Sequence, residues 1–290
     1  MTLAAVAPTR PVLRYHGGKW RLAPWIIAHF PPHKVYVEAF GGAGSVLIRK
    51  PRSYAEVYND IWGRVVDVFR VLRDPDMATD LEYRIRMTPY ARAEFEETGE
   101  HELAAITDVI ERARRTILRA FAGHGSAAVC GLHSTGFRSN TTRSGTTPAE
   151  DWRGWPDCIP LFTERLQGVV IERREASEVI RQHDGPETLH YVDPPYVQST
   201  RNMERGNATY AADMDDDAHQ ALAEQLHSLR GMVILSGYRC QLYDELYGTW
   251  ARVETVAVAD GARERIESLW LNPACVAAPN HGPLFEGTVA

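Results

Sequence analysis

The stretch at residues 190–196, His-Tyr-Val-Asp-Pro-Pro-Tyr, constrains the fold of this chain more than any other. The residues before Asp193 are apolar or aromatic enough to predict a short buried strand. Pro194 and Pro195 lack a backbone N–H and fix φ, so neither a strand nor a helix can continue through them. Asp193 is therefore expected at the carboxyl end of a strand, where ligands bind in open α/β sheets. Alone, the pattern is more typical of a turn with an exposed acid, so the rest of the chain decides its meaning.

Strands and helices alternate on both sides of a long central segment. The residue pattern predicts strands at 35–38, 55–58, 169–172 and 232–236, with helices at about 20–30 and 175–182 and another that follows Asp217 and runs to about 229. Residues 252–258 and 267–271 predict a closing hairpin. This alternation is typical of an α/β fold built around one open sheet.

A glycine-rich turn follows the first predicted strand. Residues 39–45, Ala-Phe-Gly-Gly-Ala-Gly-Ser, allow positive φ and bring backbone N–H groups close to a ligand at a helix start. The turn is neither GxGxxG nor a P-loop, which disfavours a nicotinamide dinucleotide or ATP. Asp60, at the end of the next strand, is placed to bind the hydroxyls of a ribose. An isolated Asp at that position would more often cap a helix.

The alternation stops between residues 73 and 164. This insert is expected to be helical, with a basic helix at 107–121, and then a polar, glycine-punctuated loop at 134–147. From residue 112 to 147 there are six arginines and no acid, whereas the chain as a whole carries a net charge of −6. A basic segment on an acidic body suits phosphate binding. Charge alone fits a solvated arginine-rich helix equally well.

Several classes of protein are disfavoured by composition. The four cysteines are far apart and have no zinc-ligand spacing, so we expect reduced thiols and no metal. No apolar run approaches the ~20 residues of a membrane span, and the first residues lack the order of a signal peptide. These features predict a cytoplasmic protein without a membrane partner.

Four motifs, in this order, resemble those of the Dam-like N6-adenine DNA methyltransferases of the phage and prophage type. They are Tyr15-His-Gly-Gly-Lys19, Glu38-Ala-Phe-Gly-Gly-Ala-Gly-Ser45, Asn59-Asp60 and Asp193-Pro-Pro-Tyr196. The resemblance covers nearly the whole chain. It implies a Rossmann-like, S-adenosylmethionine-dependent methyltransferase sheet in residues 1–72 and 165–290. Residues 73–164 would form an inserted, mainly helical and loop domain that recognises DNA.

The resemblance also implies S-adenosylmethionine as the methyl donor. Lys19 would lie near the methionine carboxylate and Asp60 at the ribose. Glu175 stands where the family usually has Asp, which leaves its contact with the cofactor open. The cofactor-binding residues implied are Tyr15, Lys19, Glu38, Phe40, Gly42, Gly44, Asp60, Glu175 and Asp193.

Asp193, Pro194, Pro195 and Tyr196 are the catalytic residues that the resemblance implies. The lone pair of adenine N6 is delocalised into the ring, so N6 is a poor nucleophile. Asp193, ionised at neutral pH if its pKa is the usual value of about 3.9, would accept one N6 hydrogen and the Pro194 carbonyl the other. Tyr196 would stack on an adenine flipped out of the duplex.

Double-stranded DNA is the partner implied, and the resemblance leaves open a cognate restriction endonuclease and the oligomeric state. Phe137 could act as a wedge or a stacking ring. The DNA-binding residues expected in the insert are Arg115, Arg119, Arg138, Asn140, Thr142 and Arg143. Three alternatives remain: a cytosine-N4 methyltransferase, which more often has Ser at Asp193; a protein-glutamine methyltransferase, with Asn there; and a catalytically silent DNA-binding remnant.

Overall fold

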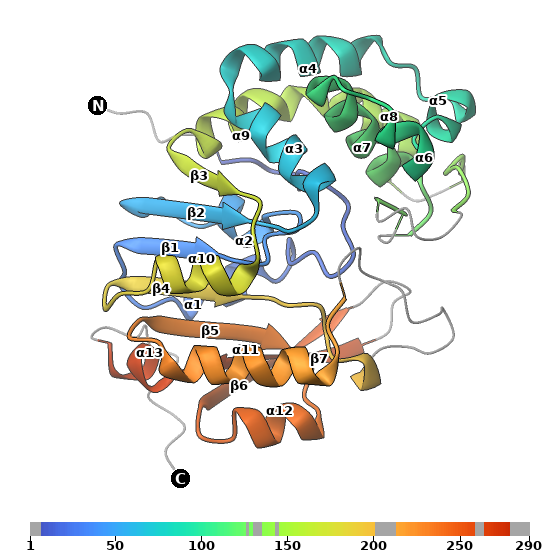
Figure 1. Cartoon of the computed structure of the whole chain (residues 1–290). Helices are drawn as coiled ribbons and strands as arrows, with labels where there is room; N and C mark the ends of the chain where they lie inside the picture. Colours follow the sequence, from blue (N-terminus) through green and yellow to red (C-terminus); the bar gives the residue numbers. More distant parts are fainter. Residues whose placement is uncertain are drawn as a thin grey trace.

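A seven-stranded sheet with the order β3-β2-β1-β4-β5-β7-β6 forms the centre of the computed structural model (Figure 1). The structure describes residues 7–125, 128–129, 135–142, 145–200, 213–258 and 264–278. β1 to β5 are parallel, and β7 runs antiparallel to both β5 and β6. The strands are β1 Val35–Glu38, β2 Ala55–Asn59, β3 Val169–Glu172, β4 Thr188–Val192, β5 Met232–Gly237, β6 Ala251–Val258 and β7 Glu264–Leu271. The predicted α/β sheet with a closing hairpin is confirmed.

The order of the strands reverses at β1. Its neighbours are β2 on one side and β4 on the other, with Val37 opposite Val57 and His190. Because the three strands are parallel, their carboxyl ends lie at the same edge of the sheet. Such a switch point leaves a crevice in which α/β proteins bind ligands.

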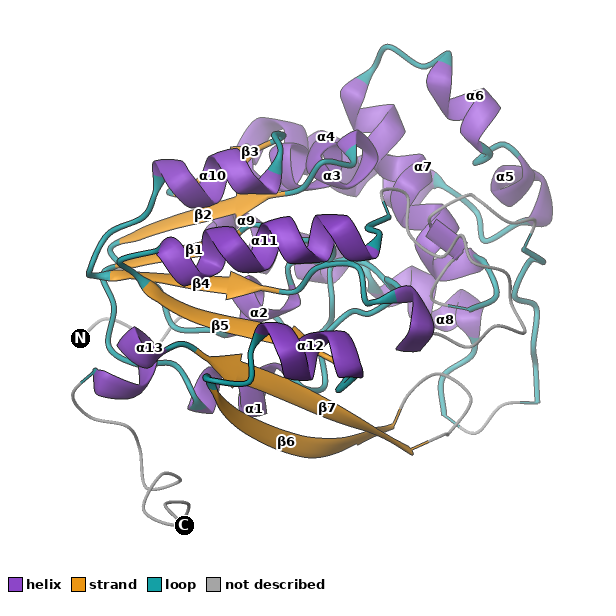
Figure 2. Ribbon diagram, turned by 60° about the horizontal axis from the view of Figure 1, so that its bottom comes forward, coloured by secondary structure: helices purple, strands orange, loops and turns teal. Residues whose placement is uncertain are grey.

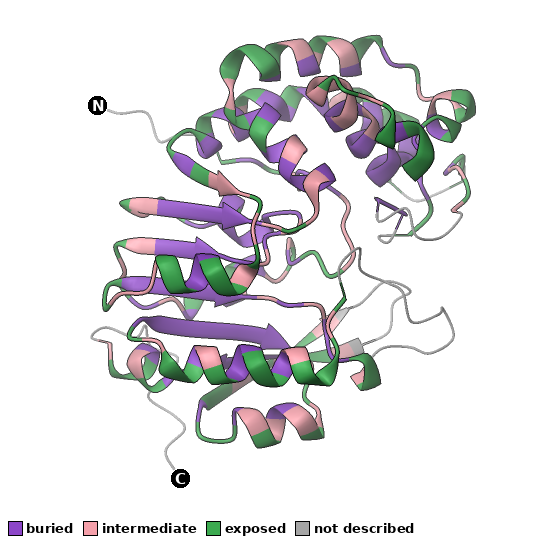
Figure 3. Cartoon of the chain, in the orientation of Figure 1, coloured by how far each residue is buried: buried purple, intermediate pink, exposed green. Residues whose placement is uncertain are grey.

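Helices cover both faces of the sheet (Figure 2). α10 (Ala176–Gln182), α11 (Asp216–Ser228) and α12 (Gln241–Leu246) pack on one face, and α1 (Ala23–Ala28), α2 (Ser45–Arg49) and α13 (Pro273–Ala277) on the other. β4 and β5 are buried along their whole length (Figure 3). None of the helices in the described part of the chain is long and apolar enough to cross a membrane.

The first helix is shorter than predicted. α1 begins at Ala23 instead of Trp20, and Pro24 lies in its first turn. Proline favours that position because its missing N–H would have no partner there.

The insert is built from short helices that pack against α3 (Gly63–Arg73), at the upper right of Figure 1. Ile117, Phe121 and Phe162 of the insert belong to the same apolar cluster as Val68 of α3. The expected boundary after residue 164 falls within the last helix of this group. The helices are α4 (Pro75–Met87), α5 (Arg92–Glu96), α6 (Glu100–Ala104), α7 (Val109–Ala122), α8 (Pro148–Gly154) and α9 (Ile159–Leu166).

Candidate active site

A cavity of about 510 Å³ lies at the carboxyl ends of β1, β2 and β4. This volume is in the range of small-molecule sites. The charged side chains in its lining are Lys19, Glu38, Asp60, Arg174, Glu175, Asp193 and Asp213. Acids therefore outnumber bases, which suits a ligand with a positive charge and hydroxyl groups better than a polyphosphate.

The glycine loop between β1 and α2 forms one wall of the cavity. Gly42 has φ +48°, and a Cβ there would lie 3.0 Å from the ring of Tyr15, which also lines the cavity. Gly44 has φ +59°, but the structure places it behind the loop: its Cβ would lie 2.7 Å from the ring of Phe69 of α3. Gly44 thus allows the loop to pack on α3 and is not part of the described cavity lining.

Asp60 is held by two backbone N–H groups. Its Oδ2 accepts a hydrogen bond from Gly42 N at 2.8 Å, and its Oδ1 accepts one from Trp62 N, also at 2.8 Å. A carboxylate oxygen can accept more than one hydrogen bond, so both remain able to bind a hydroxyl. Burial raises the pKa of Asp60. The alternative of a helix cap is wrong, because α3 begins after Trp62 with no side-chain cap.

Glu38 is a buried acid that joins β1 to α2. Its Oε2 accepts hydrogen bonds from Tyr36 Oη at 2.7 Å and from Leu47 N at 2.9 Å. The second bond satisfies an N–H group in the first turn of α2 that has no partner within the helix. Burial raises the pKa of Glu38 to about 8.

Asp193 directly follows β4 and forms an ion pair with Lys19. Lys19 Nζ lies 2.9 Å from Asp193 Oδ1, and both side chains are largely buried, with 5% and 16% exposed. Gly17, at φ 73°, allows the tight turn before Lys19 and accepts a hydrogen bond from its Nζ at 3.0 Å. Burial raises the pKa of Asp193 to about 6, although Lys19 lowers it. Asp193 is therefore mostly ionised at pH 7, as expected, but with a pKa well above the usual value.

Tyr196 is enclosed in this structure, with 6% of its surface exposed. Lys19 Nζ lies 4.7 Å from the centroid of its ring, and the ring of Tyr238 packs against it at 4.6 Å and an interplanar angle of 71°. Its hydroxyl donates a hydrogen bond to Glu267. The stacking expected of Tyr196 would therefore require a neighbouring ring to move.

A family model described as D12 class N6 adenine-specific DNA methyltransferase matches residues 15–259, which include all four motifs and the insert. The chain belongs to the D12 class of N6 adenine-specific DNA methyltransferases. A search of curated proteins finds no match.

In this D12-class methyltransferase, four more of the expected cofactor and catalytic residues line the cavity, whereas Tyr196 is not part of its described lining. These four are Phe40, Pro194, Pro195 and Glu175. Glu175 lies just before α10, is exposed and caps no N–H group of that helix. Its carboxylate therefore has no capping role, and the residue forms part of the cavity wall.

The arginines of α7 and Arg138, all in the insert of the methyltransferase, have partners within the protein. Arg115 Nε lies 2.7 Å from Glu111 Oε1. Arg119 and Arg138 are buried, and they donate hydrogen bonds to the carbonyls of Ala128 and Phe121, both at 2.8 Å. Arg112 and Arg114 of α7 also form ion pairs, with Asp67 and with Glu94 and Glu111. The net positive charge of this segment in the sequence is therefore largely balanced in the structure, and Arg119 and Arg138 support the insert from inside.

The polar loop of the insert is tied to the end of α7. His124 N donates to Gly136 O at 3.0 Å, and Arg138 N donates to Ala122 O at 2.7 Å. Phe137 packs against Tyr90, with ring centroids 4.9 Å apart, which favours a structural role over a wedge in DNA. Asn140 and Thr142 are exposed, whereas Arg143 lies outside the described residues.

Within the described part of the chain, no three His, Cys, Asp or Glu residues are grouped so that they could hold an ion. Cys158, Cys240 and Cys275 are free thiols, and Cys130 lies outside the described residues.

Glu267 of β7 belongs to this site, but the sequence motifs do not identify it. It is 3% exposed, and its carboxylate lies 3.4 Å from Lys19 Nζ. One signal was present in the sequence: Glu267 alternates with Leu269 and Leu271 along a strand, and both leucines are fully buried. An acid in such a register is expected to be buried and to need a partner.

Proposed function

We propose that this D12-class enzyme transfers a methyl group from S-adenosylmethionine to N6 of an adenine flipped out of duplex DNA. The observation that carries the proposal is the Asp193–Lys19 pair at the edge of the switch-point cavity. Family membership supplies the base and the atom that is methylated. The ion pair supplies a buried carboxylate that can receive a hydrogen bond from that atom.

The cavity fits the proposed cofactor. Its acid-rich lining suits a sulfonium ion, and the left-handed φ of Gly42 lets the loop backbone lie close to a ligand. We propose that Tyr15, Phe40 and Gly42 line the cofactor, that Asp60 binds its ribose hydroxyls, and that Glu175 lies near its adenine. When bound, S-adenosylmethionine supplies an electrophilic methyl group.

Asp193 and Pro194 would orient the adenine. The Asp193 carboxylate accepts one N6 hydrogen and the Pro194 carbonyl the other, which favours a pyramidal amine with its lone pair out of the ring plane. Pro195 restricts φ and so stiffens the loop that carries this carbonyl. Lys19 favours the ionised form of Asp193, and Asp193 is placed to take up the proton that N6 loses after transfer. Catalysis then rests mainly on positioning.

The aromatic pair Tyr196 and Tyr238 lies beside this loop. Extracting a base from the duplex costs a few kcal/mol, and stacking on an aromatic ring returns about 1–3 kcal/mol. Since Tyr238 packs against Tyr196, we propose that Tyr238 shifts when the base enters and that Tyr196 then stacks on it.

The pH dependence of the reaction tests the role of Asp193. Because burial raises its pKa to about 6, acidification below that value protonates the carboxylate that must accept the N6 hydrogen. We expect kcat/KM to fall about tenfold per pH unit below about pH 6 and to change little from pH 7 to 8. Steady-state rates over this range, with cofactor affinity measured at each pH, check this. An acid limb near about pH 4, the usual range of an exposed Asp, would contradict it.

The proposed DNA contact consists of the exposed loop residues Asn140 and Thr142, the partly exposed Arg115 of α7, and Arg143, which lies outside the described residues. Asn140→Ala is expected to weaken DNA binding without changing cofactor affinity or the unfolding temperature. If Asn140 contacts a base edge, about 1–3 kcal/mol of discrimination at one base pair should be lost. Fluorescence anisotropy with duplexes that differ at single positions measures this loss.

Arg138→Ala provides the contrast, because Arg138 is buried and donates a hydrogen bond to Phe121 O. It is expected to lower stability by about 1–3 kcal/mol. If Arg138→Ala lost DNA affinity at unchanged stability, Arg138 would bind DNA directly and the supporting role assigned to it would be wrong.

A further inference from the structure

Glu267 is held at the centre of a group of side chains from four separate parts of the chain. It lies on β7, whose neighbour β5 contributes Ser236, while Tyr196 comes from the loop after β4 and Lys19 from the turn near the amino end. Glu267 Oε1 lies 3.4 Å from Lys19 Nζ and accepts hydrogen bonds from Tyr196 Oη and, at 3.4 Å, from Ser236 Oγ. A single carboxylate oxygen thus contacts three different elements.

Burial makes these contacts necessary. Glu267 is 3% exposed, and an ionised carboxylate without partners is strongly destabilised at such a position. A well-packed apolar residue would often be as stable there. What the acid adds is a fixed location for the two groups that surround Asp193: Lys19 Nζ is held between Asp193 and Glu267, and the Tyr196 ring is fixed through its hydroxyl.

The charges in this group act on Asp193 from several sides. Lys19 is a cation shared by two carboxylates, Asp193 and Glu267. Lys19 lowers the pKa of Asp193, and the negative charge of Glu267 raises it. The other titratable or charged neighbours are Tyr191 on β4, Glu38 on β1, and Tyr238 with Arg265, whose guanidinium lies 5.1 Å from the Tyr238 ring centroid.

We propose that Glu267 is a positioning residue of the transfer reaction, which holds Lys19 and Tyr196 in the arrangement that Asp193 requires. The proposal rests on the proposed role of Asp193 as acceptor of the N6 hydrogen. Glu267 acts through Lys19 and Tyr196 and does not touch the adenine itself.

Glu267→Gln tests this, because the amide keeps the size and an oxygen that can accept from Tyr196 but removes the charge. We expect kcat to fall about tenfold to a hundredfold, because Lys19 loses the second carboxylate that fixes its position beside Asp193. We also expect the acid limb of kcat/KM to move to lower pH, because a like charge near Asp193 is gone and Lys19 is no longer shared. If Glu267 only supported the fold, Glu267→Gln would lower the stability of the protein without moving the acid limb of kcat/KM.

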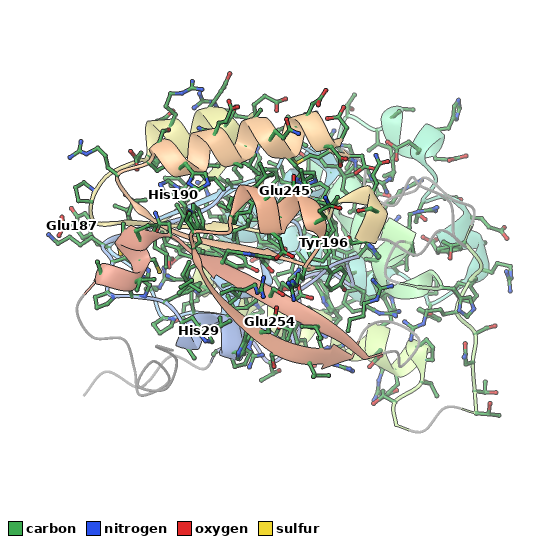
Figure 4. All side chains as sticks on the ribbon, turned by 90° about the horizontal axis from the view of Figure 1, so that it is seen from below. His29, Glu187, His190, Tyr196, Glu245 and Glu254 are labelled. Carbon is green, nitrogen blue, oxygen red and sulfur yellow. The ribbon has the colours of Figure 1, made fainter. Side chains whose placement is uncertain are left out.

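Glu254→Gln is the matched control in the same hairpin. Glu254, labelled on β6 and apart from Tyr196 in Figure 4, accepts from Ser268 and pairs with Arg252 at 3.0 Å. This variant should keep the wild-type kcat and acid limb.

Two further variants apply if Glu267→Gln does not fold. Glu267→Asp keeps the charge and Tyr196→Phe removes only the hydroxyl, so both should lower kcat and leave the acid limb in place. A wild-type kcat in both would overturn the proposal, as would a wild-type kcat and acid limb in a folded Glu267→Gln protein. Asp193→Asn in the same assays separates the two proposals. If it abolishes activity while the Glu267 variants behave as wild type, only the role of Glu267 is refuted. An active Asp193→Asn enzyme would instead refute the proposed role of Asp193.

Discussion

Asp193→Asn is expected to lower kcat about 1000-fold, equivalent to roughly 4 kcal/mol of transition-state stabilisation. The amide has nearly the same shape as the carboxylate, but it has no charge and cannot take up the proton that N6 loses. It also leaves Lys19, 5% exposed, without the ion pair at 2.9 Å. Single-turnover rates with saturating DNA and cofactor measure the loss, and calorimetry shows whether the cofactor still binds.

Asp184→Asn is the control for this variant. Asp184 precedes β4 at the opposite end from Asp193 and accepts backbone hydrogen bonds from Arg230 and, at 2.8 Å, Gly231, which an amide oxygen can also accept. Its rate should stay near that of the wild type. An Asp193→Asn enzyme within about tenfold of the wild-type rate would show that Asp193 is not the acceptor.

Lys19→Met is expected to have the second large effect, on stability as well as activity. Removing one partner of a buried ion pair typically costs about 3–5 kcal/mol, because the remaining charge is left unpaired. Here the carboxylates of Asp193 and Glu267 would both lose their contact with Lys19. Lys19 lowers the pKa of Asp193, so in the variant this pKa rises above about 6.

The stability of the Lys19→Met variant depends on pH through Asp193. At acidic pH Asp193 of the variant is protonated and carries no charge that needs a partner. At alkaline pH it is ionised, and its negative charge is then left without Lys19. The loss of unfolding free energy should therefore be larger at about pH 8 than at about pH 5, which urea titrations at the two values can measure. A loss that is the same at both values would contradict a charge effect.

Lys34→Met gives the comparison for a surface pair. Lys34 Nζ lies 2.7 Å from Glu187 Oε1, but both side chains are more than 60% exposed. Figure 4 shows Glu187 at the left edge of the molecule, well away from Tyr196, which lies near the centre of the view. Such a pair contributes about 0–1 kcal/mol, so this variant should unfold close to the wild type at both pH values.

Local patterns in the sequence were sufficient to predict the sheet and the position of Asp193. The strand Val35–Glu38 was predicted with its observed bounds, because a short apolar run between turn residues carries its own signal. The two prolines after Asp193 likewise end β4, because they lack a backbone N–H and have a fixed φ. These features depend on neighbours within a few residues, which a single sequence displays directly.

Contacts between distant residues could not be predicted in this way. Lys19 and Asp193 are 174 residues apart, and Tyr196 and Glu267 are 71 apart. The partner of Arg138 is the backbone carbonyl of Phe121. Every residue has such a carbonyl, so the amino-acid sequence does not indicate which one binds an arginine. The number of arginines therefore indicated a basic surface, whereas folding brings acids and carbonyls to most of them.

The identity of the methylated atom tests the central claim most directly. Duplex DNA incubated with the enzyme and S-adenosylmethionine that carries an isotopically labelled methyl group can be digested to nucleosides and analysed by mass spectrometry. The proposed function predicts the label in N6-methyladenine with the wild-type enzyme and almost none with Asp193→Asn. Label in N4-methylcytosine, or no labelled nucleoside from a folded enzyme that binds the cofactor, would contradict it.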